Sequence, residues 1–333
     1  MPLSYFQCSD CGQCFEPNQV TYNCLTCGGN LDTHFSFEEN LAEINQTDIL
    51  QSNEASIWRY APLLAVPDPG FTSTPLHQVG WTPVYQPETL RKNLGVRELW
   101  IKDESRNPSA SFKDRASALV VARAIEANIE TIIAASTGNA GAAMACMAAS
   151  VGIKAVIIAP RSAPPAKVAQ LLTFGAQVVL VDGTYDHAFD LSIEASHELG
   201  WYNRNTGYNP YTVEGKKTAG LEIWEQVLQN REKYPQNLTV FIPVGDGNIL
   251  CGVAKGFVDL LALGWIEKLP RLVGVQAQGS AAIFNAFEAG RDSIDPVSAK
   301  TVADSISVDL PRDGLRALKR VRQSGRASCR GRV

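Results

Sequence analysis

Short apolar runs alternate with longer helical patterns through the middle of the chain. The predicted strands, rich in Ile, Val and Ala, are 131–135, 155–159, 177–181, 238–244 and 271–275. The helices predicted between and beside them are 115–126, 140–150, 165–174, 187–199, 215–229 and 249–263. Strands that alternate with helices are typical of parallel sheets with helices on both faces. The sequence therefore predicts an α/β fold.

Lys113 stands at the start of a predicted helix, Asp114 to Glu126, after a charged strand end and a turn at Asn107-Pro108. The positive end of a helix dipole disfavours a charge on a lysine placed there. The neutral amine is the form that attacks a carbonyl, so this position favours a nucleophilic lysine. A surface lysine near a helix start is the alternative interpretation.

Two turns that contain glycine follow predicted strands and lead into helices. They are Ser136-Thr-Gly-Asn-Ala-Gly141 and Gly245-Asp-Gly-Asn248. This order places backbone N–H groups and a helix N-terminus around an anion, although such turns also serve simply to reverse the chain. Neither turn fits the dinucleotide fingerprint or the GxxxxGK[ST] loop. A nucleophilic lysine together with two anion-binding turns is what pyridoxal phosphate requires.

Four motifs carry a resemblance to a known family. They are Asn107-Pro-Ser-Ala-Ser-Phe-Lys-Asp-Arg115, Ser136-Thr-Gly-Asn-Ala140, Asn209-Pro-Tyr-Thr-Val-Glu-Gly-Lys-Lys-Thr218 and Pro243-Val-Gly-Asp-Gly-Asn248. On these motifs the chain resembles the threonine synthases, within the tryptophan-synthase-β-like (fold type II) pyridoxal-phosphate enzymes. The resemblance covers roughly residues 70–315. It implies a lyase that converts O-phosphohomoserine and water to threonine and phosphate by γ-elimination and β-addition.

The resemblance also implies roles for individual residues. Lys113 would form the Schiff base with pyridoxal phosphate and, once released, act as the general base. The implied cofactor-binding residues are Asn139 at the ring hydroxyl and Gly245, Asp246, Gly247 and Asn248 at the phosphate. Ser136 and Thr137 would receive the substrate carboxylate. The candidates for binding the substrate phosphate are Arg204, Asn205, Thr206, Lys216 and Lys217.

Thr212 departs from the family pattern, which has an arginine at this position to bind the substrate phosphate. Threonine has no bidentate cation. Either Arg204 or Lys216 replaces that arginine, or the substrate carries another leaving group. Two alternatives therefore stay open: a pyridoxal-phosphate-dependent serine/threonine dehydratase or β-replacement enzyme, and a truncated, non-catalytic remnant.

Five of the eight cysteines lie in the first 27 residues. Four of them form two CxxC pairs, each followed by glycine: Cys8, Cys11, Cys24 and Cys27. Such turns point both thiolates at one metal, which predicts a closed structural zinc site. Cys14 lacks a following glycine and is left out. A disulfide pair or free thiols are the alternative.

The expected organisation has a small N-terminal ribbon and two α/β domains, with the cofactor in the cleft between these domains. The predicted ranges are a ribbon at 1–30, a connecting arm at 31–75, a large domain at 76–116 and 206–315, an inserted small domain at 117–205, and a tail at 316–333. The tail is rich in arginine with little apolar periodicity, so disorder is expected there. The resemblance implies that the C-terminal part is truncated, which leaves no residue to assign to the pyridine nitrogen.

The composition of the chain argues against nucleic-acid binding and against a membrane location. The net charge is −4, with 45% hydrophobic and 19% charged residues, which is ordinary for a packed α/β protein and offers no basic surface for nucleic acid. The first residues lack a signal peptide pattern, and no run of 18 apolar residues occurs. The expected location is the cytoplasm, without a membrane partner. The expected partner is a small amino-acid phosphate, and a homodimer stays open.

Overall fold

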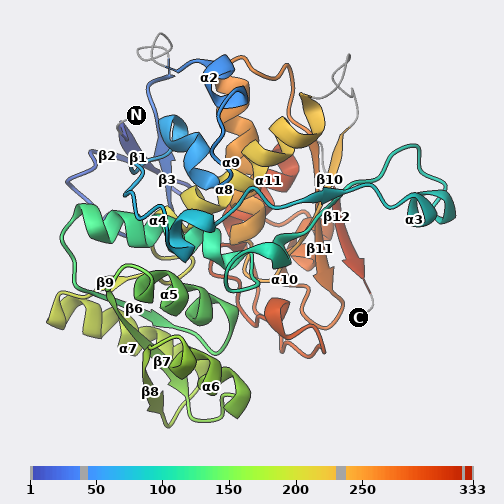
Figure 1. Cartoon of the computed structure of the whole chain (residues 1–333). Coiled ribbons are helices and arrows are strands. Elements are labelled where there is room, and N and C mark those ends of the chain that lie inside the picture. Colours follow the sequence, from blue (N-terminus) through green and yellow to red (C-terminus); the bar gives the residue numbers. More distant parts are fainter. Residues whose placement is uncertain (1–2, 38–43, 230–237, 325–326, 332–333) are drawn as a thin grey trace.

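The computed structural model describes residues 3–37, 44–229, 238–324 and 327–331 and contains two parallel sheets (Figure 1). The first has the order β8-β7-β6-β9, from β6 (Thr131–Ala135), β7 (Lys154–Pro160), β8 (Gln177–Val181) and β9 (Tyr202–Asn203). The second has the order β10-β11-β12, from β10 (Thr239–Pro243), β11 (Arg271–Ala277) and β12 (Ala327–Gly331). All neighbouring strands in both sheets are parallel, which confirms the predicted α/β class. The domain boundaries stay a prediction.

Of the eight helices named next, the first six follow the predicted ranges to within a few residues, and the last two were not predicted. They are α4 (Lys113–Glu126), α5 (Asn139–Ala149), α6 (Pro165–Thr173), α7 (Tyr185–Leu199), α8 (Tyr211–Ile223), α9 (Asn248–Ala262), α10 (Ala282–Glu288) and α11 (Gly314–Gln323). Helix α8 begins four residues before its predicted start, because the Asn209 side chain accepts from the Tyr211 N–H. In the described ranges no helix combines the length and apolar character that crossing a membrane requires.

Helix α8 lies at the centre of the molecule, between α4 and α9 (Figure 1). Nearly every residue of α8 is buried, including Glu214, Lys216 and Lys217. Glycines allow the close approach: a Cβ on Gly215 would lie 2.1 Å from the Arg115 carbonyl, and one on Gly252 would lie 2.4 Å from the Cβ of Lys216. This packing holds Lys113, Lys216 and Asn248 on three adjacent helices.

The N-terminal ribbon extends further than predicted. Its antiparallel sheet has the order β2-β1-β3, from β1 (Tyr5–Cys8), β2 (Cys14–Phe15) and β3 (Leu31–His34). Strand β3 falls in the range predicted as a connecting arm. The same range contains the 3₁₀ helix η1 (Ile57–Leu63), in which Ile57, Tyr60 and Leu63 are fully buried. Residues 31–75 thus contribute to the ribbon and the core, because their apolar side chains are spaced too irregularly to be recognised from the sequence.

Six smaller elements lie between the ribbon and Lys113. They are α2 (Gln46–Leu50), η2 (Pro75–Gln78), β4 (Val84–Tyr85), α3 (Glu88–Asn93), β5 (Ile101–Lys102) and η3 (Glu104–Arg106), the last of which leads into the Lys113 loop. Strands β4 and β5 pair in antiparallel fashion and carry α3 outward from the body of the molecule (Figure 1). The side of the molecule opposite α3 holds the ribbon.

The disorder expected for 316–333 is wrong for the described part of this tail. Residues to Gln323 form α11, which buries Ala317, Leu318 and Val321 against the core. Its arginines do not repel one another, because they meet acidic partners: Arg316 pairs with Asp32 and Asp313, and Arg320 pairs with Asp32. Backbone from 327 to 331 forms β12 beside β11. Residues 325–326 and 332–333 lie outside the described ranges.

Candidate functional site

Lys113 is the first residue of α4 and is presented by a rigidly bonded loop. Asn107 accepts from the Gly80 N–H and donates to Glu104. Asp114 accepts from the backbone N–H of Ser109 and from its hydroxyl. The Lys113 N–H itself donates to the Ser111 hydroxyl at 3.2 Å. These bonds explain why the small and polar residues of this motif precede the lysine: they fix the position from which its side chain extends.

Lys113, Arg204 and Lys216 form a group of basic side chains whose charges affect one another. Burial lowers the pKa of Lys113, and the charge of Arg204 lowers it further. Burial also lowers the pKa of Lys216 far below its usual range, and the charges of Arg204 and Lys113 add to this effect. Because the charges of these groups affect one another's pKa, they lie within electrostatic reach of each other. A buried cluster of positive groups is suited to an anion.

Arg204 has an unused donor in this cluster. Its side chain is 1% exposed, and burial lowers its pKa to about 10. Its Nε donates to the Ser117 hydroxyl at 3.3 Å and its Nη1 to the Thr206 hydroxyl at 2.8 Å. The buried Nη2 has no acceptor among the described residues. An unsatisfied buried guanidinium N–H is costly, and a bound anion would satisfy it.

Asn205 and Thr206 both bond to neighbouring protein groups, and their contact with a substrate phosphate stays a prediction. The Asn205 amide links the Ala135 N–H, 2.8 Å away, to the Ser192 hydroxyl, 2.7 Å away. It therefore joins the end of β6 to α7, and its side chain is already engaged. Thr206 is half-buried and accepts from Arg204, so it orients the guanidinium.

The turn after β6 is organised by Ser136. The Ser136 hydroxyl accepts from the Gly141 N–H at 2.9 Å and from the Gly138 N–H at 3.2 Å, which caps the start of α5. Thr137 is half-buried at the tip of this turn. Asn139, the first residue of α5, donates to the Ser305 hydroxyl at 3.4 Å. The expected contacts of Ser136 and Thr137 with a substrate carboxylate stay a prediction.

The second glycine turn lies between β10 and α9. Gly247 has a φ of +97°, a left-handed conformation that glycine adopts readily. A Cβ on Gly245 would lie 2.8 Å from the Ile306 backbone. Asn248 is buried and accepts from Lys216 at 2.5 Å. The first backbone N–H groups of α9 lack intrahelical acceptors, as at any helix start, so the turn can bind a phosphate.

Asp246 is the acidic residue of this turn. Burial raises its pKa to about 7, and the nearby Asp313 carboxylate contributes to the increase. The Asp246 side chain accepts from the Arg312 N–H, and its carbonyl accepts from the Asp313 N–H at 3.1 Å. Asp246 therefore binds the segment before α11 through both its carboxylate and its backbone carbonyl.

Contacts across long sequence distances bring these turns together. Ser305 touches Asn139, and Ile306 packs on Gly245. A Cβ on Gly207, next to Thr206, would lie 2.6 Å from Arg312. No role was predicted for 305–306 or 312–313, because the sequence of an irregular turn does not indicate which distant residues it contacts.

Thr212 is the second residue of α8. It is fully buried, and its hydroxyl donates to the Asn209 carbonyl at 2.7 Å. In this position threonine closes the first turn of α8. It supplies no cation, so the positive groups near Lys113 are Arg204 and Lys216.

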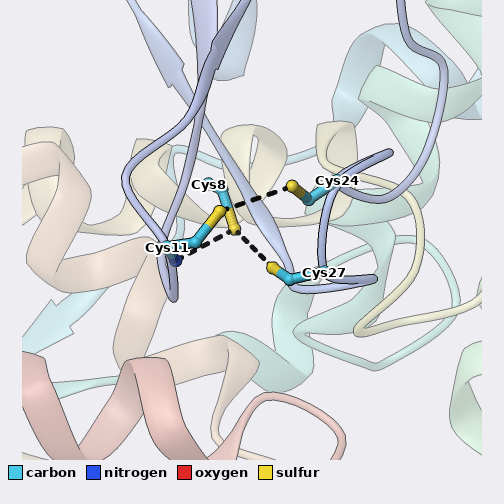
Figure 2. Close-up of side chains that lie close together, drawn as sticks. All are labelled: Cys8, Cys11, Cys24 and Cys27. Atoms are coloured by element: carbon cyan, nitrogen blue, oxygen red, sulfur yellow. Dashed lines mark hydrogen bonds between the residues drawn. The ribbon is translucent and has the colours of Figure 1, made fainter.

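The four predicted cysteine ligands form a cluster, as Figure 2 shows. The sulfur atoms of Cys8, Cys11, Cys24 and Cys27 all lie within 4.8 Å of one another. The Sγ–Sγ distances are 3.5 Å for Cys8–Cys27 and 3.6 Å for Cys11–Cys24. Zinc–sulfur bonds of about 2.3 Å in a tetrahedron require sulfur separations of about 3.8 Å. The geometry therefore suits one zinc ion.

Sequence comparison relates the chain to known enzymes. A family model described as pyridoxal-phosphate dependent enzyme matches residues 76–329. The chain is 34% identical to the threonine synthase of Methanosarcina acetivorans, over 97% of this chain and 77% of that protein. It is 33% identical to the threonine synthase of Methanocaldococcus jannaschii, over 96% of this chain and 77% of that protein.

Solved structures share the fold. The processed form of threonine deaminase isoform 2 from Solanum lycopersicum has a TM-score of 0.64 at 25% identity, covering 79% of this chain and 72% of that one. Maize serine racemase has a TM-score of 0.65 at 23% identity, covering 79% and 74%. Enzymes with several reactions thus share this architecture, so the reaction must be argued from the site.

Proposed function

The chain belongs to the pyridoxal-phosphate dependent enzymes, and on this premise we propose that it is a threonine synthase that converts O-phosphohomoserine and water to threonine and phosphate. The identity of about a third to two threonine synthases over nearly the whole chain supports this reaction. The second support is a buried cationic cluster beside Lys113, which suits a substrate with an anionic leaving group.

The residues present fit the cofactor. Lys113 would hold it covalently, the turn from Gly245 to Asn248 would hold its phosphate, and Asn139 would meet its ring hydroxyl. The fit of the turn rests on Gly247, whose φ of +97° turns the chain into the start of α9, where the first backbone N–H groups lack intrahelical acceptors. When bound, pyridoxal phosphate supplies an electron sink for negative charge at the substrate carbon.

Lys113 serves as the general base in this proposal. Its lowered pKa increases the fraction of neutral amine, which is the form that accepts a proton from the substrate α-carbon. The bonds that fix the 107–112 loop keep the amine in one position. Burial of the surrounding cations excludes water from competing for that proton.

Arg204 is the residue that carries the assignment of the leaving group. Its Nη2 is buried without an acceptor, and its charge reaches both Lys113 and Lys216. A departing phosphate would accept from this N–H and would neutralise the cluster. Arg204 would thereby perform the task that the family assigns to an arginine at the position of Thr212.

Kinetics of Arg204→Ala test this proposal. We expect phosphate release from O-phosphohomoserine to lose at least about thirtyfold in kcat/KM, as for truncation of one partner of a buried charge pair. The matched control is Arg161→Ala, because Arg161 forms an exposed pair with Asp182 far from this cluster. Wild-type kcat/KM in Arg204→Ala, with the cofactor bound normally, would contradict the assignment.

A dehydratase is the second candidate. Thr212 favours it, since the family arginine is absent and threonine deaminase shares the fold. Such an enzyme would act on serine or threonine and release ammonia without phosphate. Turnover of threonine to a keto acid, with no phosphate release from O-phosphohomoserine, would select this reaction instead.

We also propose that Cys8, Cys11, Cys24 and Cys27 bind one structural zinc ion. The support is the sulfur cluster and the two glycine-closed turns, in which the Gly12 N–H donates to the Cys8 carbonyl and the Gly28 N–H to the Cys24 carbonyl. Four sulfur ligands complete a tetrahedron and leave no position for a substrate, so this metal would stabilise the ribbon.

A further inference from the structure

Asn30 connects the cysteine ribbon to the segment after β11. It follows the second cysteine turn, and its carbonyl accepts from the Ser9 N–H in the first turn at 2.8 Å. Its side-chain amide donates to the Arg312 carbonyl at 2.9 Å and to the Asp313 carboxylate at 3.0 Å. Asn30 therefore binds the ribbon through its backbone and a residue 283 positions away through its side chain.

Asp313 is the central residue of this connection. It is 1% exposed and receives two further hydrogen bonds from Arg316, at 2.7 and 2.8 Å. Arg316 also donates to the Leu31 carbonyl and to Asp32, both on β3 of the ribbon. The Asp313 carboxylate is thus held from the ribbon side by Asn30 and Arg316 together.

The other side of Asp313 faces the glycine turn. Its Oδ2 accepts from the Asn248 amide at 2.7 Å, and the opposite atom of that amide accepts from Lys216. The Asp313 N–H donates to the Asp246 carbonyl, and a Cβ on Gly247 would lie 2.8 Å from the Asp313 carbonyl oxygen. Asp313 therefore determines which way the Asn248 amide points and how closely the turn packs.

We propose that Asp313 is a positioning residue through which the cysteine ribbon sets the geometry of the Gly245–Asn248 turn and of Lys216. The coupling rests on the proposed function to the extent that this turn binds the cofactor phosphate. A carboxylate held on one face by the ribbon presents a fixed acceptor on the other face. If Asn30 is removed, Asp313 and Asn248 can rotate, and the preorganised anion site loses affinity.

Cofactor affinity of Asn30→Ala is the decisive measurement, made on the full chain by titrating pyridoxal phosphate and following its absorbance. We expect the Kd to rise about tenfold, in line with one lost hydrogen bond to a charged group. Zinc content should not change, because Asn30 supplies no sulfur ligand. Because Asn30 is only half-buried, we expect the Asn30→Ala variant to fold.

Lys319→Ala is the matched control. Lys319 also joins α11 to the ribbon, through the Ser9 carbonyl at 2.5 Å, but it does not contact Asp313. Unchanged cofactor affinity in Lys319→Ala beside weaker binding in Asn30→Ala would support the proposal. Equal weakening in both variants would overturn it, because the effect would then come from the general contact between the ribbon and α11. Unchanged affinity in both variants would also overturn it.

Asp313→Asn provides a second route if Asn30→Ala loses zinc. This variant changes no residue of the ribbon. It keeps the size of the side chain but replaces one acceptor oxygen of the carboxylate with an amide N–H₂ donor. Weaker binding of pyridoxal phosphate at full zinc content would support the role of Asp313, and wild-type affinity would overturn it. The readout is cofactor affinity and not turnover, so a failure of the proposed threonine synthase reaction would be recognised separately.

Discussion

Arg115 and Glu222 form an ion pair that is fully buried, with Nη2 and Oε2 2.8 Å apart. Arg115 lies two residues after Lys113 on α4, and Glu222 lies on α8. Burial alone would raise the pKa of Glu222, but the charges of Arg115 and Lys102 outweigh burial and bring it to about 2. The pair therefore holds α4, which begins at Lys113, against the central helix α8.

Glu222→Gln should reduce the free energy of unfolding by about 3–5 kcal/mol, because it leaves Arg115 as a buried charge with one partner fewer. Chemical denaturation with urea measures this change. The control is Glu126→Gln, which removes an exposed pair with Arg123 and should cost less than about 1 kcal/mol. Equal effects of the two substitutions would contradict the structural role of the buried pair.

The same pair predicts an acid dependence. The folded-state pKa of Glu222 is depressed from 4.5 to about 2, so its stabilisation is complete above pH 4.5 and is lost as the pH falls toward 2. The difference in unfolding free energy between wild type and Glu222→Gln should shrink across that window. A difference that stays constant from pH 5 to pH 2.5 would show that the charge is not the cause.

Asp246→Asn should have the opposite pH dependence. Its folded-state pKa is raised to about 7, so ionisation of Asp246 costs stability progressively as the pH rises from about 4 to 7. Relative to Asp246→Asn, wild type should lose up to about 1.4 kcal/mol per pH unit in that interval. Thermal unfolding at pH 4 and pH 8 measures it, and a variant without any gain at pH 8 would refute the prediction.

Lys113→Ala should abolish covalent binding of pyridoxal phosphate and turnover, and should leave the zinc content unchanged. In the proposed site the Lys113 amine would attack the cofactor aldehyde, whereas the cysteine cluster lies in the N-terminal ribbon. Absorbance in the near-visible range and metal analysis of the same preparation test both halves. Wild-type turnover in this variant would make the site assignment wrong.

Single serine substitutions at Cys8, Cys11, Cys24 and Cys27 should each reduce zinc occupancy and lower the thermal stability of the chain. A structural site with three sulfur ligands binds zinc more weakly, and the ribbon then loses its crosslink. Cys14→Ser is the control, since Cys14 lies outside the cluster. Full zinc occupancy in all four variants would rule out the site.

Local patterns were sufficient for most of the elements. The predicted strands at 131–135 and 177–181 match the observed strands residue for residue, because continuous apolar runs between turns have few other stable arrangements. Lys113 at the start of a helix and the four clustered cysteines were also predictable, since each depends on neighbours within a few residues. Helix α11 was missed, because its arginines suggest a solvated tail until their partners Asp32 and Asp313 are known.

The sequence by itself determined the fold class, the position of Lys113 at a helix start, the glycine turns and the paired cysteines, all of which follow from short-range spacing. Tertiary structure alone decided that Arg204 carries a buried donor without an acceptor among the described residues and that the Thr212 hydroxyl bonds to the first turn of α8. It also placed Asp313 between the ribbon and Asn248. The physical reason is that burial and charge pairing depend on which distant segments pack together, and no local pattern encodes that.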